Sequence, residues 1–216
     1  MSASLYIPLA NHIMEAGLSH SKRQSIIKGA TAMFLSHGFN AVSMDKIAQA
    51  APVSKATLYK YFDSKHDLLA AVINELCTSL LQVMDELVID SGNVENNLKT
   101  IASAFIDLIF AEESLAIYRL VIAECYVFPE LGRLVYESGP KNALTLLELY
   151  LENVNRRKQV NIPNTGFAAD AFFSLLKGDL HFQCLLGIKA PPSAEEKTVL
   201  INQVVSLYLQ GFTYEH

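Results

Sequence analysis

The chain contains 216 residues with a mass of 23.9 kDa, of which 51% are hydrophobic and 18% are charged. This composition supplies enough apolar material for a packed core, so it excludes a chain that is disordered as a whole. Ten glycines and seven prolines are too few for a collagen-like or low-complexity sequence. The formal net charge of −5, taken alone, argues against a nucleic-acid partner.

The charge is distributed unevenly along the chain. Residues 21–66, which we call the basic segment, contain seven Lys and Arg side chains against two Asp side chains, a local charge of +5. The rest of the chain therefore carries −10. A basic segment attached to an acidic remainder indicates that the two parts have different partners, and a polyanion suits the basic one.

The cysteines and the N-terminus predict a reduced, cytoplasmic protein with no membrane insertion. An odd number of cysteines without a CxxC pair argues against a disulfide framework. The N-terminus lacks a basic region, and Pro8 interrupts its short apolar run, so it is not typical of a secretory signal. No uninterrupted apolar stretch has the length of a transmembrane helix. Residues 1–20 are expected to be a flexible arm, an extra helix or a remnant of cloning.

Helical periodicity dominates the N-terminal third of the chain. The first predicted helix runs over about residues 22–37 and ends at Gly38, a residue type that commonly terminates helices. Two short helices follow, and each begins after a serine, Ser43 or Ser54, whose hydroxyl can accept the free amide hydrogens of a first turn. A long helix then begins at a capping-box-like pattern near Ser64.

The same periodicity continues to the C-terminus. Pro129 is typical of a first helical turn, and Gly139-Pro140 predicts a kink or a helix that restarts at Pro140. Ser193 and Glu196 form a capping box before the last helix. The remaining helices are predicted over about 94–110, 114–127, 129–138, 140–157, 167–186 and 194–212. We therefore predict an all-α chain of about nine or ten helices.

Two short helices joined by a tight turn, after a longer helix, have the layout of a helix-turn-helix, whose second helix enters the major groove of DNA. Basic, hydroxyl and aromatic side chains along the second helix can reach base edges, phosphates or thymine methyl groups. Serines at helix starts, and a lysine at the start of the next helix, lie where free amide hydrogens favour an anion. The predicted DNA contacts are Ser43, Ser54, Lys55, Thr57, Tyr59, Lys60, Tyr61 and Lys65.

Residues 21–72 resemble the DNA-binding domain of TetR/AcrR-family transcriptional regulators. The matching elements are HGFNAVSMDKIA and VSKATLYKYFDSKHDLL, at fixed spacing. The resemblance implies phosphate contacts at Ser43 and Lys65 and packing roles for Leu58 and Phe62. It also implies DNA contacts in the second short helix, at Ser54, Lys55, Thr57, Tyr59 and Tyr61. It also implies a regulator, most often a repressor, that binds an operator duplex as a homodimer and responds to a small apolar or amphipathic effector. It implies no enzymatic activity and no cofactor.

The turn departs from the family pattern. The family usually has glycine where this chain has Pro52, within Ala51-Pro52-Val53-Ser54. Because proline holds φ near about −65° and cannot take the positive φ open to glycine, we expect another backbone geometry or a shifted angle between the short helices.

The rest of the chain resembles the ligand-binding and dimerisation half of the family, in its AefR-like subgroup, through FPELGRLVYESGPKNALTLLELYL and AFFSLLKGDLHFQCLLG. We therefore divide the chain into an extension (1–20), a helix-turn-helix domain (21–66) and a ligand-binding and dimerisation domain (67–216). Residues that can line an apolar cavity, with core packing as the alternative, are Cys77, Phe105, Tyr118, Cys125 and Tyr126. The apolar faces of the last two helices predict a dimer interface with Leu175, Leu176, Leu185, Val204, Leu207 and Tyr208.

Other functions have weaker support in the sequence. His181 and Cys184 share a helix face and could form half a metal site, but no second pair matches them, so packing is favoured and no metal is predicted. An enzyme with an apolar site lacks a catalytic grouping, and a DNA-binding architectural factor acting through a protein partner stays open. Polar residues within apolar helices need a partner, a ligand or an exposed face: Asp107, Glu124, Asp179 and Gln183.

Overall fold

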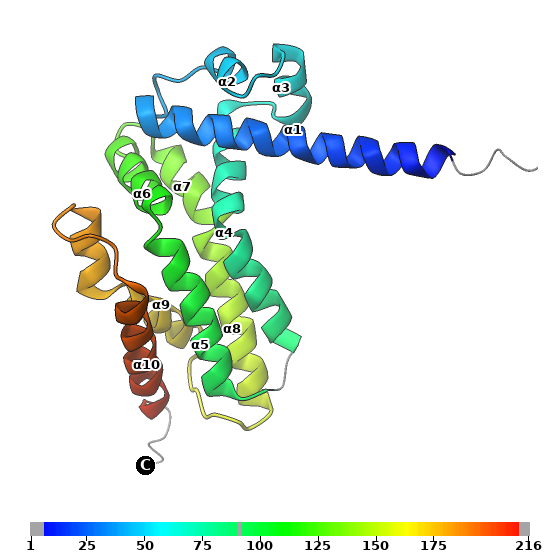
Figure 1. The fold of residues 1–216 in the computed structure, drawn as a ribbon. Coiled ribbons are helices and arrows are strands. Elements are labelled where there is room, and N and C mark those ends of the chain that lie inside the picture. Colours follow the sequence, from blue (N-terminus) through cyan, green and yellow to red (C-terminus); the bar gives the residue numbers. More distant parts are fainter. Residues whose placement is uncertain (1–6, 90–91, 212–216) are drawn as a thin grey trace, which may run out of the picture. The chain divides into compact units, whose positions relative to one another are not determined.

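The computed structural model describes the backbone of residues 7–89 and 92–211 and the side chains of residues 21–87 and 92–211. Over these ranges the chain consists of ten α-helices without a β-strand, which confirms the all-α prediction (Figure 1). The helices are α1 (Ile7–His37), α2 (Met44–Ala50), α3 (Lys55–Tyr61), α4 (Lys65–Ile89), α5 (Val94–Ile109), α6 (Glu112–Glu124), α7 (Pro129–Ser138), α8 (Pro140–Arg156), α9 (Thr165–Leu185) and α10 (Ala194–Gln210). The chain divides into two compact units, Met1–Val72 and Ile73–His216.

The first unit packs α1, α2, α3 and the start of α4 around one small core. Each helix places a fully buried apolar side chain in it: Ile26 and Phe34 from α1, Ile47 from α2, Leu58 from α3 and Leu68 from α4. Helix α1 is longer than predicted, because it begins at Ile7 rather than near residue 22. Residues 7–20 therefore continue α1, whereas residues 1–6 lie outside the described part of the chain.

The second unit has a larger core, built from α4, α5, α8, α9 and α10. Side chains without exposed surface include Leu98 of α5, Leu147 of α8, Phe172 of α9 and Val205 of α10. Tyr208 of α10 meets Phe172 edge to face at a centroid distance of 4.9 Å and donates a hydrogen bond of 2.8 Å to the Ala168 carbonyl. An aromatic ring with a satisfied hydroxyl thus joins α10 to α9 inside the unit.

The break predicted at Gly139-Pro140 is confirmed: α7 ends at Ser138 and α8 begins at Pro140. A Cβ atom at Gly139 would lie 2.6 Å from the Cys77 sulfur of α4, so only glycine allows this close approach. A second break, inside α9, was not predicted. Gly178 has φ 49° and ψ −161°, a conformation that side chains larger than hydrogen rarely adopt, and it kinks α9.

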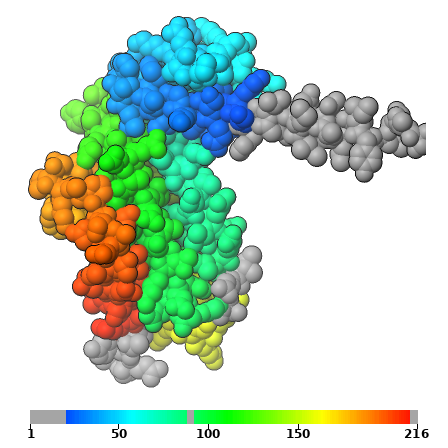
Figure 2. Space-filling model, in the orientation of Figure 1, coloured from blue at the N-terminus to red at the C-terminus, as the bar shows by residue number. Residues whose placement is uncertain are grey.

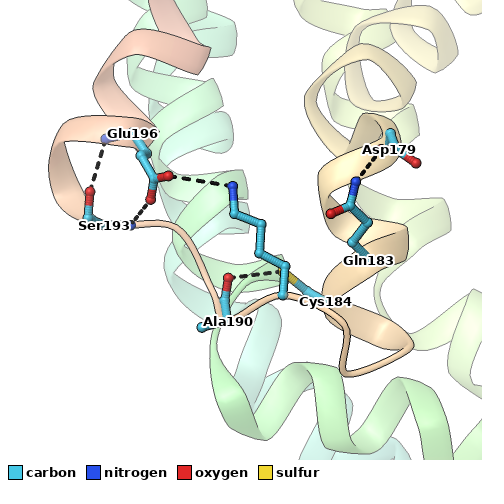
Figure 3. A network of polar contacts seen from close by, with 7 residues as sticks. Asp179, Gln183, Cys184, Ala190, Ser193 and Glu196 are labelled. Atoms are coloured by element: carbon cyan, nitrogen blue, oxygen red, sulfur yellow. Dashed lines mark hydrogen bonds and ion pairs between the residues drawn. The ribbon is translucent and has the colours of Figure 1, made fainter.

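Polar contacts hold the α9–α10 connection (Figure 3). The predicted capping box is confirmed, because Ser193 and Glu196 exchange hydrogen bonds between side chain and backbone. The Ser193 amide, followed by Lys189 at 3.5 Å, holds the pKa of the Glu196 carboxyl below its ordinary value. Asp179 accepts a hydrogen bond from Gln183, and Asp107 forms an ion pair of 2.7 Å with Lys197. Asp107, Asp179 and Gln183, which the sequence places within apolar helices, are therefore held by polar contacts.

One helical segment of the described chain, Lys65–Leu87, is long and apolar enough to cross a membrane, with a mean hydropathy of 1.4. In this fold, 44% of the 18-residue apolar window within that segment is buried. Its buried residues include Leu68 and Leu69 in the first unit and Leu80 and Met84 in the second. A core helix of a globular protein meets the same criterion of length and composition.

Candidate DNA interface and ligand cavity

The starts of α2 and α3 are organised by the two serines that the sequence singled out. The Ser43 hydroxyl accepts the Lys46 amide at 3.3 Å, and the Ser54 hydroxyl accepts the Thr57 amide at 3.1 Å. Ser54 and Thr57 also share a hydrogen bond of 2.8 Å between their hydroxyls. Both serines are exposed, so their hydroxyls cap the helices at the surface.

The turn between α2 and α3 corrects the expectation for Pro52. This proline has a positive φ of 22°, whereas we expected a geometry that avoids positive φ. Hydrogen bonds on both sides hold the turn, from the Ala51 amide to Ile47 at 2.9 Å and from the Val53 amide to Ala48 at 3.1 Å. A Cβ at Gly29 of α1 would lie 3.0 Å from the Ala51 Cβ, so α1 and the turn are tightly packed. The surrounding structure thus imposes the backbone geometry, and the proline ring is strained.

Replacing Pro52 with glycine is therefore expected to raise the free energy of unfolding by about 1 kcal/mol. Relieving a sparsely populated backbone conformation should raise the free energy of unfolding by about 1–3 kcal/mol. The greater freedom of glycine in the unfolded chain should lower it again by about 0.5–1 kcal/mol. Equilibrium urea unfolding, followed by circular dichroism, measures the difference. Pro163→Gly is the matched control, because Pro163 is exposed and has no positive φ, and it should lower stability slightly. A Pro52→Gly protein no more stable than wild type would contradict this account.

Helix α3 has one buried and one exposed face. Leu58 is fully buried, and Phe62 directly after the helix is also buried, in agreement with packing roles. Tyr59 is 44% exposed, Lys60 is exposed, and Tyr61 is half-buried. The exposed face is therefore basic and aromatic, which suits contacts with phosphates and base edges.

Lys55, at the start of α3, is paired with Asp45 of α2. The Lys55 Nζ lies 2.7 Å from the Asp45 carboxylate, and both side chains are more than half exposed. The hydrogen bond to Asp45 raises the pKa of Lys55, so the ammonium stays charged. Sequence reasoning did not identify Asp45, because ten residues and a turn separate the partners. A DNA phosphate that binds the Lys55 ammonium would have to compete with the Asp45 carboxylate for it.

Lys65 occupies a position that the sequence did not predict. Its Nζ donates to the carbonyls of Phe39 at 2.8 Å, Asn40 at 3.4 Å and Val42 at 3.0 Å, and lies 4.4 Å from the centre of the Phe39 ring. The ammonium thus holds the loop that leads to Ser43, instead of projecting freely from the start of α4. A phosphate contact by Lys65 stays a prediction, and it requires the ammonium to share donors with these carbonyls.

The second unit contains a cavity of about 460 Å³ among α4, α5, α6, α7, α8 and α9. Of the predicted residues, Cys77, Phe105 and Tyr118 belong to its wall. Cys125 and Tyr126 do not: Tyr126 is 92% exposed, and the Cys125 thiol donates to the Ile122 carbonyl at 3.5 Å. Helix α6 ends at Glu124 and is therefore shorter than the predicted helix, which ran to about residue 127. Cys125 and Tyr126 follow this helix end and lie outside the cavity wall.

Most of the cavity wall is apolar and uncharged. Burial raises the pKa of the Cys77 thiol to about 11 and also raises the pKa of the Tyr118 hydroxyl, so both groups are neutral. Ile122 and Tyr136 are exposed and also line the wall, so the cavity reaches solvent there. Sequence reasoning missed the polar wall residues Ser114 and Lys177. The signal that could have identified Lys177 is its position as a single lysine within the apolar run AFFSLLKGDLHFQCLL.

His181 and Cys184 lie in the second half of α9 and pack in the core. The His181 ring meets Phe110 and Tyr118 edge to face, each at 5.6 Å, and burial lowers the pKa of the imidazole. The Cys184 thiol donates to the Ala190 carbonyl at 3.5 Å (Figure 3). Over the described ranges, no cluster of three or more His, Cys, Asp or Glu side chains suits a metal ion.

The predicted dimer residues fall on two different sides of α9 and α10. Leu176, Val204 and Tyr208 are buried in the core of their own unit, so they cannot form an interface between copies; this part of the prediction is wrong. Leu185 is half-buried, whereas Leu175 and Leu207 are exposed. Large apolar side chains exposed nearby, which the sequence did not distinguish from core residues, are Phe167, Phe182, Leu186, Ile188 and Val199.

Two family models match this chain. Residues 26–72 match the N-terminal domain described as "Bacterial regulatory proteins, tetR family". Residues 96–213, more than half of the chain, match "AefR-like transcriptional repressor, C-terminal domain". The protein belongs to the TetR family of transcriptional regulators.

Individual TetR-family proteins resemble this one at moderate identity. The HTH-type transcriptional activator FasR of Mycolicibacterium smegmatis is 31% identical over 106 residues, 49% of this chain and 48% of FasR, so the match spans about half of that relative. A solved structure from Mesorhizobium loti, described as TetR-family, has a TM-score of 0.75 at 27% identity and covers 90% of this chain and 98% of its own. The "Flavonoid-responsive Regulator FrrA" has a TM-score of 0.69 at 32% identity, covering 89% of this chain and 97% of its own.

Proposed function

We propose that this TetR-family regulator is a homodimeric, cytoplasmic repressor that leaves its operator when a small apolar or amphipathic molecule fills the cavity of the second unit. The proposal rests on helix α4, whose residues belong to both units. Leu68 and Leu69 of this helix are buried in the core of the first unit, and Cys77 and Leu80 line the cavity. One helix therefore contributes to the unit with the DNA-binding motif and to the cavity wall.

The ligand acts by linkage. A molecule that binds one conformation of the cavity better than another shifts the protein toward that conformation, by no more than its difference in affinity. Because Ile73, Leu76 and Cys77 follow one another along α4, a bound molecule that displaces them displaces the helix that begins at Lys65. A conformation that spaces the two α3 helices of the dimer wrongly for successive major grooves lowers operator affinity.

Homodimerisation is supported by the exposed apolar face of α9 and α10. Phe167, Phe182 and Leu186 of α9 and the segment after it, with Val199 and Leu207 of α10, are all more than half exposed. Helix α10 lies at the surface of the second unit (orange to red in Figure 2). Exposed large apolar side chains concentrated on two helices are typical of an interaction surface, and a twofold dimer would cover them with a second copy of the same helices.

The experiment that tests the proposal is selection of an operator from random duplexes by the purified protein, followed by footprinting. We expect a pseudo-palindromic site with two protected half-sites about 10 base pairs, or a multiple of that, apart. The selected duplex is then titrated with and without a cavity ligand. A footprint without twofold symmetry would contradict the homodimer. A footprint that no small molecule changes would favour a DNA-binding architectural factor.

The relatives support parts of this proposal. The family model that matches residues 96–213 is described as a domain of an AefR-like transcriptional repressor, which supports repression. The name of FrrA says that it responds to flavonoids, which supports a response to a small molecule. FasR is named as an activator, so repression is tested separately, by placing the selected operator between a promoter and a reporter gene. Lower reporter output in the presence of the regulator supports repression, and higher output contradicts it.

A further inference from the structure

The wall of the cavity in the second unit is mostly apolar and includes one cationic side chain, Lys177, and one acidic side chain, Asp170. Lys177 of α9 lines the cavity and is half-buried. Its Nζ lies 6.0 Å from the centre of the Phe105 ring, and it forms no hydrogen bond or ion pair with any residue in the described ranges. An ammonium group that is partly removed from water and lacks a close counter-ion is destabilised, and an anion bound beside it would relieve that cost.

The surroundings of Lys177 do not neutralise it. Burial lowers the pKa of Lys177, and the negative charge of Asp170 partly offsets this effect. Asp170 does not come within ion-pair distance of Lys177. Asp170 also belongs to α9, is exposed to solvent, and lines the same cavity. Burial, and after it the charge of Lys177, lower the pKa of His181, which lies beyond the Gly178 kink of α9. A bound anion near Lys177 would therefore meet a cation that lacks a close partner.

Ser114 of α6 provides a second, independent observation. The residue is 4% exposed and lines the cavity, and its hydroxyl has no hydrogen-bond partner. Buried hydroxyl groups are normally hydrogen-bonded, so an unpartnered one on a cavity wall indicates that a bound molecule supplies the partner. The Ser114 hydroxyl can donate to an oxygen atom, as can the neutral Tyr118 hydroxyl on the same wall.

We infer that the cavity binds an apolar molecule that carries one anionic oxygen group, a carboxylate or an ionised phenol, with Lys177 as its counter-ion and Ser114 as a second polar contact. The inference rests on the proposed function, because it names the class of the effector. The volume of about 460 Å³ suits a single small molecule, and the apolar wall surrounds its hydrocarbon part. Asp170 disfavours a second negative charge on the ligand, so a monoanion suits the site better than a dianion.

Calorimetric titration with matched probes tests the inference. One pair is dodecanoate and dodecanol, and the other is a hydroxylated flavone and its fully methylated counterpart. Within each pair the apolar part is alike, and only one member can carry an anionic oxygen. The wild-type protein is expected to bind the anionic member about ten- to a hundredfold more tightly, since a hydrogen bond to a charged group contributes about that factor. Preference in the first pair identifies a carboxylate, and preference in the second identifies a phenol.

Three variants connect the preference to the proposed residues. Lys177→Met keeps an unbranched side chain, one atom shorter, without the charge. It should bring the affinities for the two members of a pair to within about twofold, chiefly by weakening the binding of the anionic member. Ser114→Ala should weaken the anionic probes several-fold. Lys141→Met is the matched control, because Lys141 is exposed and outside the cavity, and it should leave the preference intact. Circular dichroism confirms that each variant is folded.

The outcomes separate this inference from the proposed function. Equal wild-type affinity for both members of each pair, an undiminished preference in Lys177→Met, or no binding of any probe would each overturn the inference. If a neutral molecule releases the operator, the proposed function holds and the anionic class is wrong. If an anion binds through Lys177 without changing operator affinity, the inference holds and the proposed function is wrong.

Discussion

Replacing Lys55 and Lys60 together with glutamine is expected to weaken operator binding by at least about a hundredfold, because each lysine of α3 can supply a charge-assisted hydrogen bond to the DNA. Both side chains are exposed, and neither belongs to the core, so the variant should fold. The slope of log affinity against log salt concentration should become less steep by about two, one unit for each phosphate that a lysine no longer neutralises. Fluorescence anisotropy of a labelled operator at several salt concentrations measures both quantities.

Two further variants give this experiment its controls. Lys141→Gln removes an exposed lysine from the second unit and should change neither affinity nor slope by a comparable amount. Asp45→Asn removes the carboxylate that pairs with Lys55 at 2.7 Å, so it frees the ammonium and should strengthen DNA binding several-fold. Equal affinity and slope in wild type and the Lys55→Gln/Lys60→Gln variant would exclude α3 as the DNA-binding helix.

Replacing Phe182 and Leu207 together with glutamate is expected to raise the dissociation constant of the dimer by at least about a hundredfold, because an apolar interface would bury carboxylates without counter-ions. Each side chain is 59% exposed in the single chain, so the substitutions do not enter its core. Sedimentation equilibrium measures the oligomeric state. Operator affinity should fall as well, because a monomer reaches only one half-site.

Tyr126→Glu is the matched control for the interface. Tyr126 is a large exposed side chain of the segment between α6 and α7, outside α9 and α10. This variant should remain a dimer with unchanged operator affinity. A Phe182→Glu/Leu207→Glu protein that remains dimeric would exclude this face as the interface, and dissociation of Tyr126→Glu would indicate the α6–α7 segment instead.

Local interactions explain which parts of the fold could be predicted from the sequence. The caps at Ser43, Ser54 and Ser193 join atoms three residues apart, and the break at Pro140 follows from the missing amide of one residue. By contrast, α1 extends back to Ile7 without a start signal that the periodicity could identify. The kink at Gly178 also lies in a continuous apolar pattern, where a single glycine is compatible with a straight helix.

Tertiary contacts explain most of the remaining differences. Pro52 adopts a positive φ because Gly29 and Ala51 pack closely across the turn, a contact between residues that are distant in the sequence. Lys65 binds carbonyls of residues 39–42, which no spacing rule relates to it. In α9 and α10 the sequence contains apolar residues on more than one face, so periodicity could not distinguish Leu176, which is buried, from Phe182, which is exposed.

The cavity was predicted in part for the same reason. Cys77, Phe105 and Tyr118 lie within long apolar helices that face the interior of the second unit, whereas Cys125 and Tyr126 follow the end of α6. The position of that helix end depends on the packing of α7 against α6 and on the hydrogen bonds of the Val127 and Phe128 amides to the Glu124 carbonyl. Lys177 and Ser114 become conspicuous only when six helices are assembled around them.

A molecule in the cavity of the second unit is expected to control the affinity of the first unit for DNA. Operator affinity of the wild-type protein is the most direct measurement, made with the cavity empty and with it saturated by dodecanoate or the hydroxylated flavone. We expect at least about a tenfold loss of operator affinity when the cavity is occupied and, by linkage, an equal loss of ligand affinity on operator-bound protein. Calorimetric occupancy of the cavity with unchanged operator affinity would contradict the account.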